Sequence, residues 1–260
     1  MREKYVIVCV GAGGTGSFFL TVLARELWSS PHMRKTLKGV YIFDGDILET
    51  KNLSRQVFSD EDVGYNKASK MAQIINEVYD LNWTSMATYL DNEEQLIQIF
   101  SHFENDTKVI PIIIGCVDNH GCRIFLEKYF KTLDDIIYID SANEEKNGQV
   151  IFSYKKNGQV ISPCRSFYFP DILSGDTKPI TEMSCEEINN SGGGQHIETN
   201  VQAASIIRTE LWHILNNEDI HPGYVLFSID SFYQEYISFK EYIKNKSILD
   251  SSTNKENSES

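Results

Sequence analysis

A glycine cluster near the start of the chain, set between an apolar run and a helical pattern, constrains the fold most strongly. Residues 4–10 (KYVIVCV) have the composition of a buried parallel strand and lead directly into GAGGTG at residues 11–16. Residues 15–28 then place apolar side chains at helical spacing. A G-x-G-x-x-G sequence in this position permits a tight turn and brings backbone N–H groups at the helix start close to a phosphate. Alone, this motif is weak, because a glycine-rich turn can also bind no ligand.

Strand and helix patterns alternate over the first part of the chain. Further strands are predicted at residues 39–43, 84–90, 108–117 and 136–140, and helices at 66–79, 92–103 and 119–131. This alternation predicts an α/β fold with a doubly wound, mostly parallel, Rossmann-like sheet. We expect this nucleotide-binding core to cover residues 1–145.

The pattern changes after residue 145. It predicts a hairpin over residues 148–161, a long polar loop over 170–196, one amphipathic helix over 197–216 and two strands within 223–239. These elements form a C-terminal extension of antiparallel strands and one long helix, which we assign to the same domain over residues 146–244. The last residues are almost purely polar, so residues 245–260 are expected to be a disordered tail.

The composition excludes several classes of protein. With 260 residues, 41% of them hydrophobic, the chain can bury a large core. Its formal charge of −13 disfavours nucleic-acid binding, because an acidic surface repels phosphates. The five cysteines include no Cys-x-x-Cys pair, so no zinc site is expected. No stretch approaches the ~20 apolar residues that span a bilayer, so we expect a cytoplasmic protein with no membrane partner.

Two aspartates follow the second predicted strand, in Asp44-Gly45-Asp46. The carboxylate of Asp44 could accept hydrogen bonds from ribose hydroxyls, although it lies further from the glycine motif than is usual. Asp46 either contributes to the same site or only stabilises the turn. The glycine motif and these two aspartates fit NAD and ATP equally well.

Three later motifs separate the two ligands. They are KNLSRQ at residues 51–56, VGYNK at 63–67 and CVDN at 116–119, with Arg123 beyond the last of them. A dehydrogenase does not need Asn, Arg, Lys and Asp gathered around the phosphates. An enzyme that attacks a triphosphate does need them, because cations neutralise the phosphates and a carboxylate binds Mg²⁺.

Taken in this order and spacing, the motifs resemble those of the ubiquitin-activating-enzyme-like adenylyltransferases, the family of ThiF, MoeB and HesA. The resemblance covers residues 4–155 closely and the rest loosely. It implies that the chain uses ATP and Mg²⁺ to adenylate the C-terminal glycine of a small ubiquitin-like or sulfur-carrier protein, and releases pyrophosphate.

The resemblance also implies roles for individual residues. The glycine loop borders the phosphates, Asp44 holds the ribose, Asn52 and Arg55 contact the triphosphate, Lys67 neutralises it and Asp118 coordinates Mg²⁺. Lys67 also begins a predicted helix, where the helix dipole disfavours a cation, which favours a functional role. The residues assigned to nucleotide binding are Gly11, Gly13, Gly14, Gly16, Asp44, Asp46, Asn52, Arg55, Lys67 and Asp118.

The chain departs from many members of that family in two ways. It lacks the paired Cys-x-x-Cys motifs that bind a structural zinc. It also begins almost at the first predicted strand, without a preceding helical segment whose arginine reaches into a partner subunit. A homodimer is therefore one possible state of the chain and is not required by the resemblance. The layout resembles that of the ThiF-like proteins of plasmid PRTRC systems.

Cys185 allows two interpretations. Some members of the family use a cysteine in the loop before the long helix as a nucleophile, and the position of Cys185 matches. Its neighbours Glu186 and Glu187 would raise the pKa of the thiol and slow its attack. Cys9 and Cys116 are expected in the core.

Other functions stay open at this level. A NAD-dependent oxidoreductase could use the same glycine loop, and a tRNA-modifying member of the family could activate a nucleic-acid carboxylate, although the net charge opposes the latter. A non-catalytic scaffold is a further alternative. The joint presence of Arg55, Lys67 and Asp118 argues against it.

Overall fold

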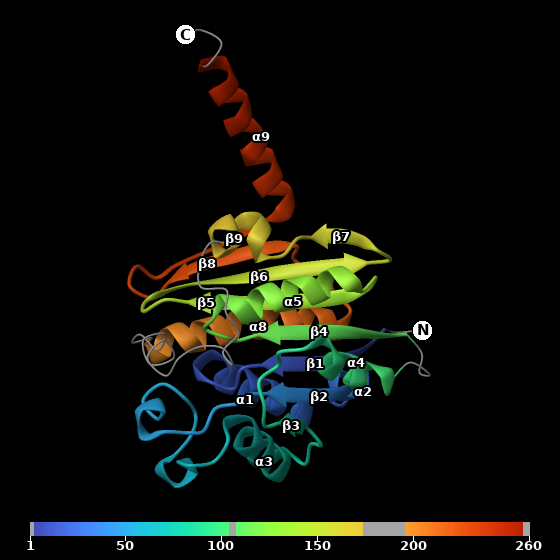
Figure 1. Ribbon diagram of the computed structural model, residues 1–260, viewed down its shortest axis with the longest axis vertical. Helices are drawn as coiled ribbons and strands as arrows, with labels where there is room; N and C mark the ends of the chain where they lie inside the picture. The colour runs from blue at the N-terminus through green and yellow to red at the C-terminus, as the bar shows by residue number, and fades with distance from the viewer. Residues whose placement is uncertain (1–2, 104–107, 174–195, 257–260) are drawn as a thin grey trace.

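The protein is built around one nine-stranded sheet (Figure 1). The computed structural model describes residues 3–103, 108–173 and 196–256. The strand order is β3-β2-β1-β4-β5-β6-β8-β9, with β7 paired to β6. The strands are β1 Lys4–Val10, β2 Leu37–Phe43, β3 Thr84–Met86, β4 Val109–Gly115, β5 Ile136–Asn143, β6 Asn147–Lys156, β7 Gln159–Ser162, β8 Gly223–Ser228 and β9 Tyr233–Ser238. The prediction of a mostly parallel sheet with antiparallel C-terminal strands is confirmed.

Helices cover both faces of the sheet. One face packs against α1 (Gly14–Ser29), α2 (Pro31–Thr36), α3 (Lys67–Tyr79) and α8 (Ile197–Asn216), which together enclose the larger core. The other face packs against α4 (Glu93–Ser101) and α5 (His120–Thr132), which enclose the second core. Because both faces are covered, β1 and β4 are buried along almost their whole length and read as continuous apolar runs.

The parallel part of the sheet has a topological switch point. The central strand β1 pairs with β2 on one side and with β4 on the other, all in parallel. The chain therefore leaves β1 in one direction and later returns on the opposite side. The carboxyl ends of these strands diverge there, and such a crevice is where open α/β sheets bind ligands. The glycine loop and the start of α1 lie at this edge.

The sheet continues across residue 145. β5 and β6 pair antiparallel from Ile136↔Lys155 to Asn143↔Gly148, and β6 pairs onward with β8. The division into a core over residues 1–145 and a C-terminal part over 146–244 remains a prediction. None of the described helices is both long and apolar enough to cross a bilayer.

The C-terminal end differs from the sequence-based expectation. Instead of a disordered tail from residue 245, the structure has the helix α9 over Phe239–Glu256, which projects away from the sheet (Figure 1). Its first turn is anchored, because Phe239 and Tyr242 lie against the ring of Tyr168. An anchored first turn removes the cost of helix nucleation, and the polar residues that follow can then extend the helix.

Short elements connect the main ones. The segment between α1 and β2 contains α2, whose start is capped by Ser30 with Pro31 in the first turn. The strand expected over residues 84–90 ends at Met86, before Tyr89. The remaining elements are η1 Thr50–Asn52, η2 Asp60–Asp62, α6 Arg165–Tyr168 and η3 Pro170–Leu173.

Candidate active site

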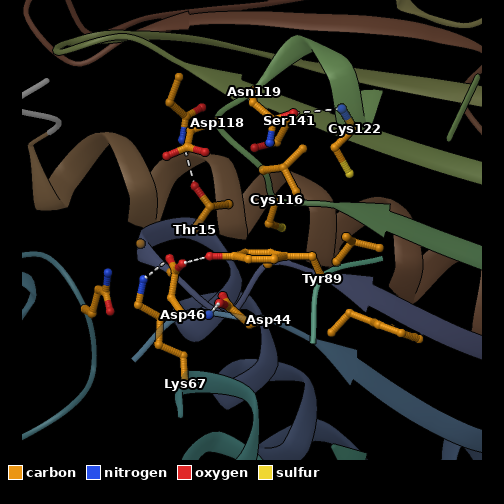
Figure 2. A pocket seen from close by; sticks show the side chains of 18 of the residues that line it. Thr15, Asp44, Asp46, Lys67, Tyr89, Cys116, Asp118, Asn119, Cys122 and Ser141 are labelled. Atoms are coloured by element: carbon orange, nitrogen blue, oxygen red, sulfur yellow. Dashed lines mark hydrogen bonds and ion pairs between the residues drawn. The ribbon is translucent and has the colours of Figure 1, made fainter. Parts of the chain in front are cut away.

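A cavity of about 1280 Å³ opens at the carboxyl ends of the parallel strands. Nearly all the site residues expected from the sequence line it, contributed by β1, β2, β4 and the segments that follow them (Figure 2). Those lining it are Gly11, Gly13, Gly14, Asp44, Asp46, Asn52, Arg55, Lys67 and Asp118. Gly16 packs behind the loop instead, and Cys185 lies outside the described residues.

The glycines of the loop have different roles. Gly11 adopts a φ of +96°, and a Cβ there would lie 2.5 Å from the carbonyl oxygen of Cys116. A Cβ on Gly16 would lie 2.0 Å from the carbonyl oxygen of Gly11, so both glycines are required by close backbone packing. Gly13 is different, because a Cβ added there would point into nearly open space. It is the N-cap of α1 and has no side-chain cap, which leaves the first N–H groups of the helix available to an anion.

Asp44 fastens the glycine loop to the next turn. Its Oδ2 accepts a hydrogen bond from the N–H of Ala12 at 2.7 Å, and its Oδ1 accepts one from the N–H of Asp46 at 2.9 Å. The residue is only 8% exposed, and burial raises the pKa of the carboxyl to about 6 despite the nearby Lys67. Both oxygens therefore already hold backbone groups. Ribose binding by Asp44 remains a prediction.

The buried carboxyl of Asp44 gives the stability of the protein a pH dependence. Its folded-state pKa of about 6 exceeds the ordinary value of 3.8, so folding favours the protonated form. Asp44 therefore adds up to ~3 kcal/mol to the free energy of unfolding when the pH is below 3.8, the ordinary pKa of the group. This contribution is lost as the pH rises through the folded-state pKa of about 6. Urea unfolding of the wild type and of Asp44→Asn at about pH 5 and pH 7 measures this contribution. The wild type should gain stability relative to the variant at the lower pH, and an unchanged difference would contradict the assignment.

Asp46 lies between two side chains that converge on it (Figure 2). Lys67 Nζ lies 2.6 Å from Asp46 Oδ2, and the hydroxyl of Tyr89 donates to Oδ1. Burial alone would raise the pKa of Asp46, but the Lys67 ammonium and these hydrogen bonds hold it below its ordinary value. Asp46 therefore does more than stabilise a turn: it compensates a cation placed at the start of α3.

The side chain of Asn66 fixes the same turn from the other side. Its Nδ2 donates to the carbonyl oxygens of Asp44 and Asp46, at 2.8 and 3.0 Å. Its Oδ1 accepts from the N–H of Ser69 and so caps α3. One asparagine thus sets both the path of the acidic turn and the point where α3, and with it Lys67, begins.

Asn52 and Arg55 approach the cavity from the segment after β2. Asn52 is buried in η1, where its Oδ1 accepts from the N–H of Glu49 at 3.0 Å. The backbone N–H of Arg55 donates to the carbonyl oxygen of Asn52, but its guanidinium makes no hydrogen bond or ion pair with any residue that the structure describes. A guanidinium on a cavity wall that pairs with none of the residues described is available to a bound anion.

Asp118 lies on the opposite wall, in the loop between β4 and α5 (Figure 2). It is exposed, whereas Asn119 beside it is buried and caps α5 by accepting from the N–H of Cys122 at 2.7 Å. Across the described ranges, no group of three or more His, Cys, Asp or Glu could hold a metal ion. Mg²⁺ needs only one or two carboxylates when phosphates and water complete its shell, so Asp118 fits such a role.

Two cysteines line the cavity. Cys116, expected in the core, is only partly buried, because β4 ends one residue earlier and the chain turns there into the cavity wall. Burial raises the pKa of Cys122 to about 12, although Arg123 opposes the shift. The thiol of Cys122 is therefore protonated at neutral pH and is a poor nucleophile.

Several cavity residues were missed by sequence reasoning. The ring of Tyr89 lies so close to Gly45 that a Cβ there would come within 2.7 Å of it. Asn143 Nδ2 donates to Thr15 Oγ1 at 2.7 Å, joining the end of β5 to the start of α1. The only feature of the sequence that could indicate Tyr89 is Gly45, the glycine between two aspartates, because the ring needs the space that a side chain there would fill. The contact between Thr15 and Asn143 spans 128 positions and leaves no local signal.

Comparisons with known proteins agree with the geometry. A protein-family model described as the ThiF family matches residues 2–248. The chain is 26% identical over 183 residues to the adenylyltransferase and sulfurtransferase UBA4 of Kluyveromyces lactis, covering 70% of the chain and 36% of UBA4. It is 25% identical over 178 residues to ubiquitin-like modifier-activating enzyme 5 of Bombyx mori, covering 65% and 40%. The chain thus spans less than half the length of these relatives.

Solved structures share the fold. The crystal structure of E. coli MccB with ATP superposes with a TM-score of 0.61 at 16% identity, covering 90% of this chain and 63% of that one. The crystal structure of PaaA gives a TM-score of 0.61 at 17% identity, covering 90% and 64%. At these identities the likeness concerns the fold alone.

Proposed function

Because the chain belongs to the ThiF family, we propose that it is an ATP-dependent adenylyltransferase. In this proposal it activates the C-terminal carboxylate of a small ubiquitin-like or sulfur-carrier protein and releases pyrophosphate. The names of two relatives support the proposal, since one is an adenylyltransferase and the other a ubiquitin-like modifier-activating enzyme. The structure of MccB with ATP supports the choice of nucleotide.

One observation carries the proposal: a single cavity combines a guanidinium that pairs with no described residue, a second cation and an exposed carboxylate with the open start of a helix. These groups are Arg55, Lys67, Asp118 and the N-terminus of α1 at Gly13. A carboxylate that attacks an α-phosphate is repelled by the charge already there. Catalysis of that step therefore consists mainly of orienting the two reactants and neutralising the phosphates.

Each group has a part in this chemistry. The N–H groups at Gly13 hold a phosphate, Arg55 binds phosphate oxygens through its fork of donors, and Asn52 lies beside it. Lys67, which pairs with Asp46, adds a positive point charge. Asp118 would hold Mg²⁺, which when bound would neutralise the triphosphate and orient it. The nucleophile is the carboxylate of the partner protein, so no thiol of this chain is required for adenylation.

The alternative of a NAD-dependent oxidoreductase fits the cavity less well. Such sites use an acidic residue after the second strand to accept hydrogen bonds from ribose hydroxyls. Here Asp44 takes that place, and because ATP also carries a ribose, its two backbone hydrogen bonds do not distinguish the two nucleotides. Arg55 and Lys67 have no task in hydride transfer. A homodimer, a cytoplasmic location and membership of the PRTRC-related branch remain predictions.

ATP–pyrophosphate exchange tests the proposal. The purified chain is mixed with Mg²⁺, ATP, labelled pyrophosphate and ubiquitin-like proteins encoded near its gene. Label should enter ATP only when a partner with a free C-terminal carboxylate is present. The same partner with an amidated C-terminus is the matched control, and exchange that persists with that control would contradict the proposed acceptor.

A further inference from the structure

The loop that carries Asp118 is anchored on both sides. The N–H of Cys116 donates to the carbonyl oxygen of Val10 at 2.8 Å, which fixes the loop to β1. The side chain of Asn119 fixes its other end to the first turn of α5. The carbonyl oxygen of Val117 accepts a hydrogen bond from the guanidinium of Arg123. Asp118 is therefore the exposed residue between two held neighbours.

Arg123 reaches this loop from behind the cavity. It lies one turn into α5, is 4% exposed, and uses Nη2 to hold Val117 and also the carbonyl oxygen of Ser141, the latter at 2.9 Å. Val117 and Ser141 both line the cavity. One guanidinium thus ties together the carboxyl ends of β4 and β5, although it does not itself touch the space that a ligand would fill.

A buried carboxylate orients this guanidinium. Asp140 is fully buried, and its Oδ1 lies 3.3 Å from Arg123 Nε. The other oxygen of Asp140 is bound by Arg165, whose Nη1 donates to the side chain of Gln149 at 2.6 Å. The absence of a side chain at Gly115 makes room for this group, because a Cβ there would lie 3.0 Å from Asp140 Oδ1.

We propose that Arg123 is a positioning residue for the reaction: it holds the carbonyl oxygen of Val117 so that Asp118, the next residue, presents its carboxylate to the cavity. The inference rests on the proposed function, because that function gives Asp118 its role with Mg²⁺. Arg165 provides a matched control. It binds the same carboxylate, is buried to the same degree, and makes no hydrogen bond or ion pair with residues 116–119, all of which the structure describes.

Arg123→Lys and Arg165→Lys separate positioning from mere stability. Both variants keep a cation beside Asp140, but a lysine at position 123 cannot hold Val117, Ser141 and Asp140 together. Hydrogen–deuterium exchange of the peptide over residues 116–122 should be about tenfold faster in Arg123→Lys, because a charge-assisted hydrogen bond is lost. The same peptide should be unchanged in Arg165→Lys. This measurement needs no substrate, so it is independent of whether the chain adenylates anything.

The Mg²⁺ dependence of pyrophosphate exchange supplies the second measurement. Arg123→Lys should raise the half-saturating Mg²⁺ concentration about tenfold and leave the KM for ATP near normal, whereas a loss of folded protein would lower kcat alone. Equal effects of the two variants, or unchanged amide exchange in Arg123→Lys, would overturn the proposal. If Arg123→Lys and Arg123→Gln both fail to fold while Arg165→Lys folds, Arg123 is a folding residue and the proposal is wrong. If the two variants show the expected amide exchange but the wild type catalyses no pyrophosphate exchange, the proposed function is contradicted and the positioning by Arg123 is not.

Discussion

Replacing Asp118 with alanine is expected to abolish ATP–pyrophosphate exchange at ordinary Mg²⁺ concentrations. Asp118 is the exposed carboxylate on the β4 side of the cavity, and no metal-binding cluster among the described residues could replace it. A metal ion that neutralises the triphosphate contributes several kcal/mol to the transition state, so its loss removes most of the rate. The measurement is exchange at saturating ATP over a series of Mg²⁺ concentrations.

Two further variants make this result specific. Asp118→Asn keeps the shape of the side chain and removes its charge, so it should also be severely impaired and should need much more Mg²⁺. Asp134→Ala removes an exposed carboxylate in the turn between α5 and β5, at the opposite end of these elements, and should have normal activity. If Asp118→Ala kept near-normal exchange, Asp118 would have no role with Mg²⁺.

Arg55→Ala and Lys67→Ala are each expected to reduce pyrophosphate exchange by roughly 10²–10³-fold, the scale of removing one transition-state donor. Their effects on stability should differ. The guanidinium of Arg55 has no hydrogen-bond or ion-pair partner among the described residues, so its removal should leave the unfolding midpoint unchanged. Lys67 is 9% exposed and pairs with Asp46 at 2.6 Å, so its removal leaves a carboxylate without its cation and should lower the midpoint.

Lys51→Ala is the matched control for these two cation variants. Lys51 also lines the cavity, but its side chain is 62% exposed and pairs with Glu49 at 2.7 Å. An exposed cation of this kind contributes little, and we expect nearly normal exchange. Near-normal activity in both Arg55→Ala and Lys67→Ala would show that the triphosphate binds elsewhere.

The central part of the fold follows from local sequence. β1 and β4 are apolar runs because helices cover both faces of the sheet, and the alternation of strands and helices indicates its parallel part. The predicted residues that line the cavity belong to short motifs placed at strand ends, where a parallel sheet binds ligands. Local spacing was enough in these cases because strand, turn and functional side chain are adjacent in the chain.

The remaining features depend on contacts between distant residues. The hydrogen bond between Tyr89 and Asp46 spans 43 positions, and nothing near Tyr89 in the sequence indicates it. Arg123 was noted beside CVDN, but its pairing with Asp140 depends on how α5 packs against β5. The anchoring of α9 by Phe239 and Tyr242 likewise needs the ring of Tyr168 from another element. The pattern at residues 245–256 alone indicates only a polar segment.

Calorimetric titration of the purified chain with ATP and with NAD, each with and without Mg²⁺, shows which of the two nucleotides binds to this cavity. We predict saturable binding of ATP that strengthens with Mg²⁺ and weakens in Arg55→Ala, and little binding of NAD. The prediction follows from a cavity that places Arg55, Lys67 and Asp118 around the open end of α1. Tight binding of NAD with none of ATP would contradict it.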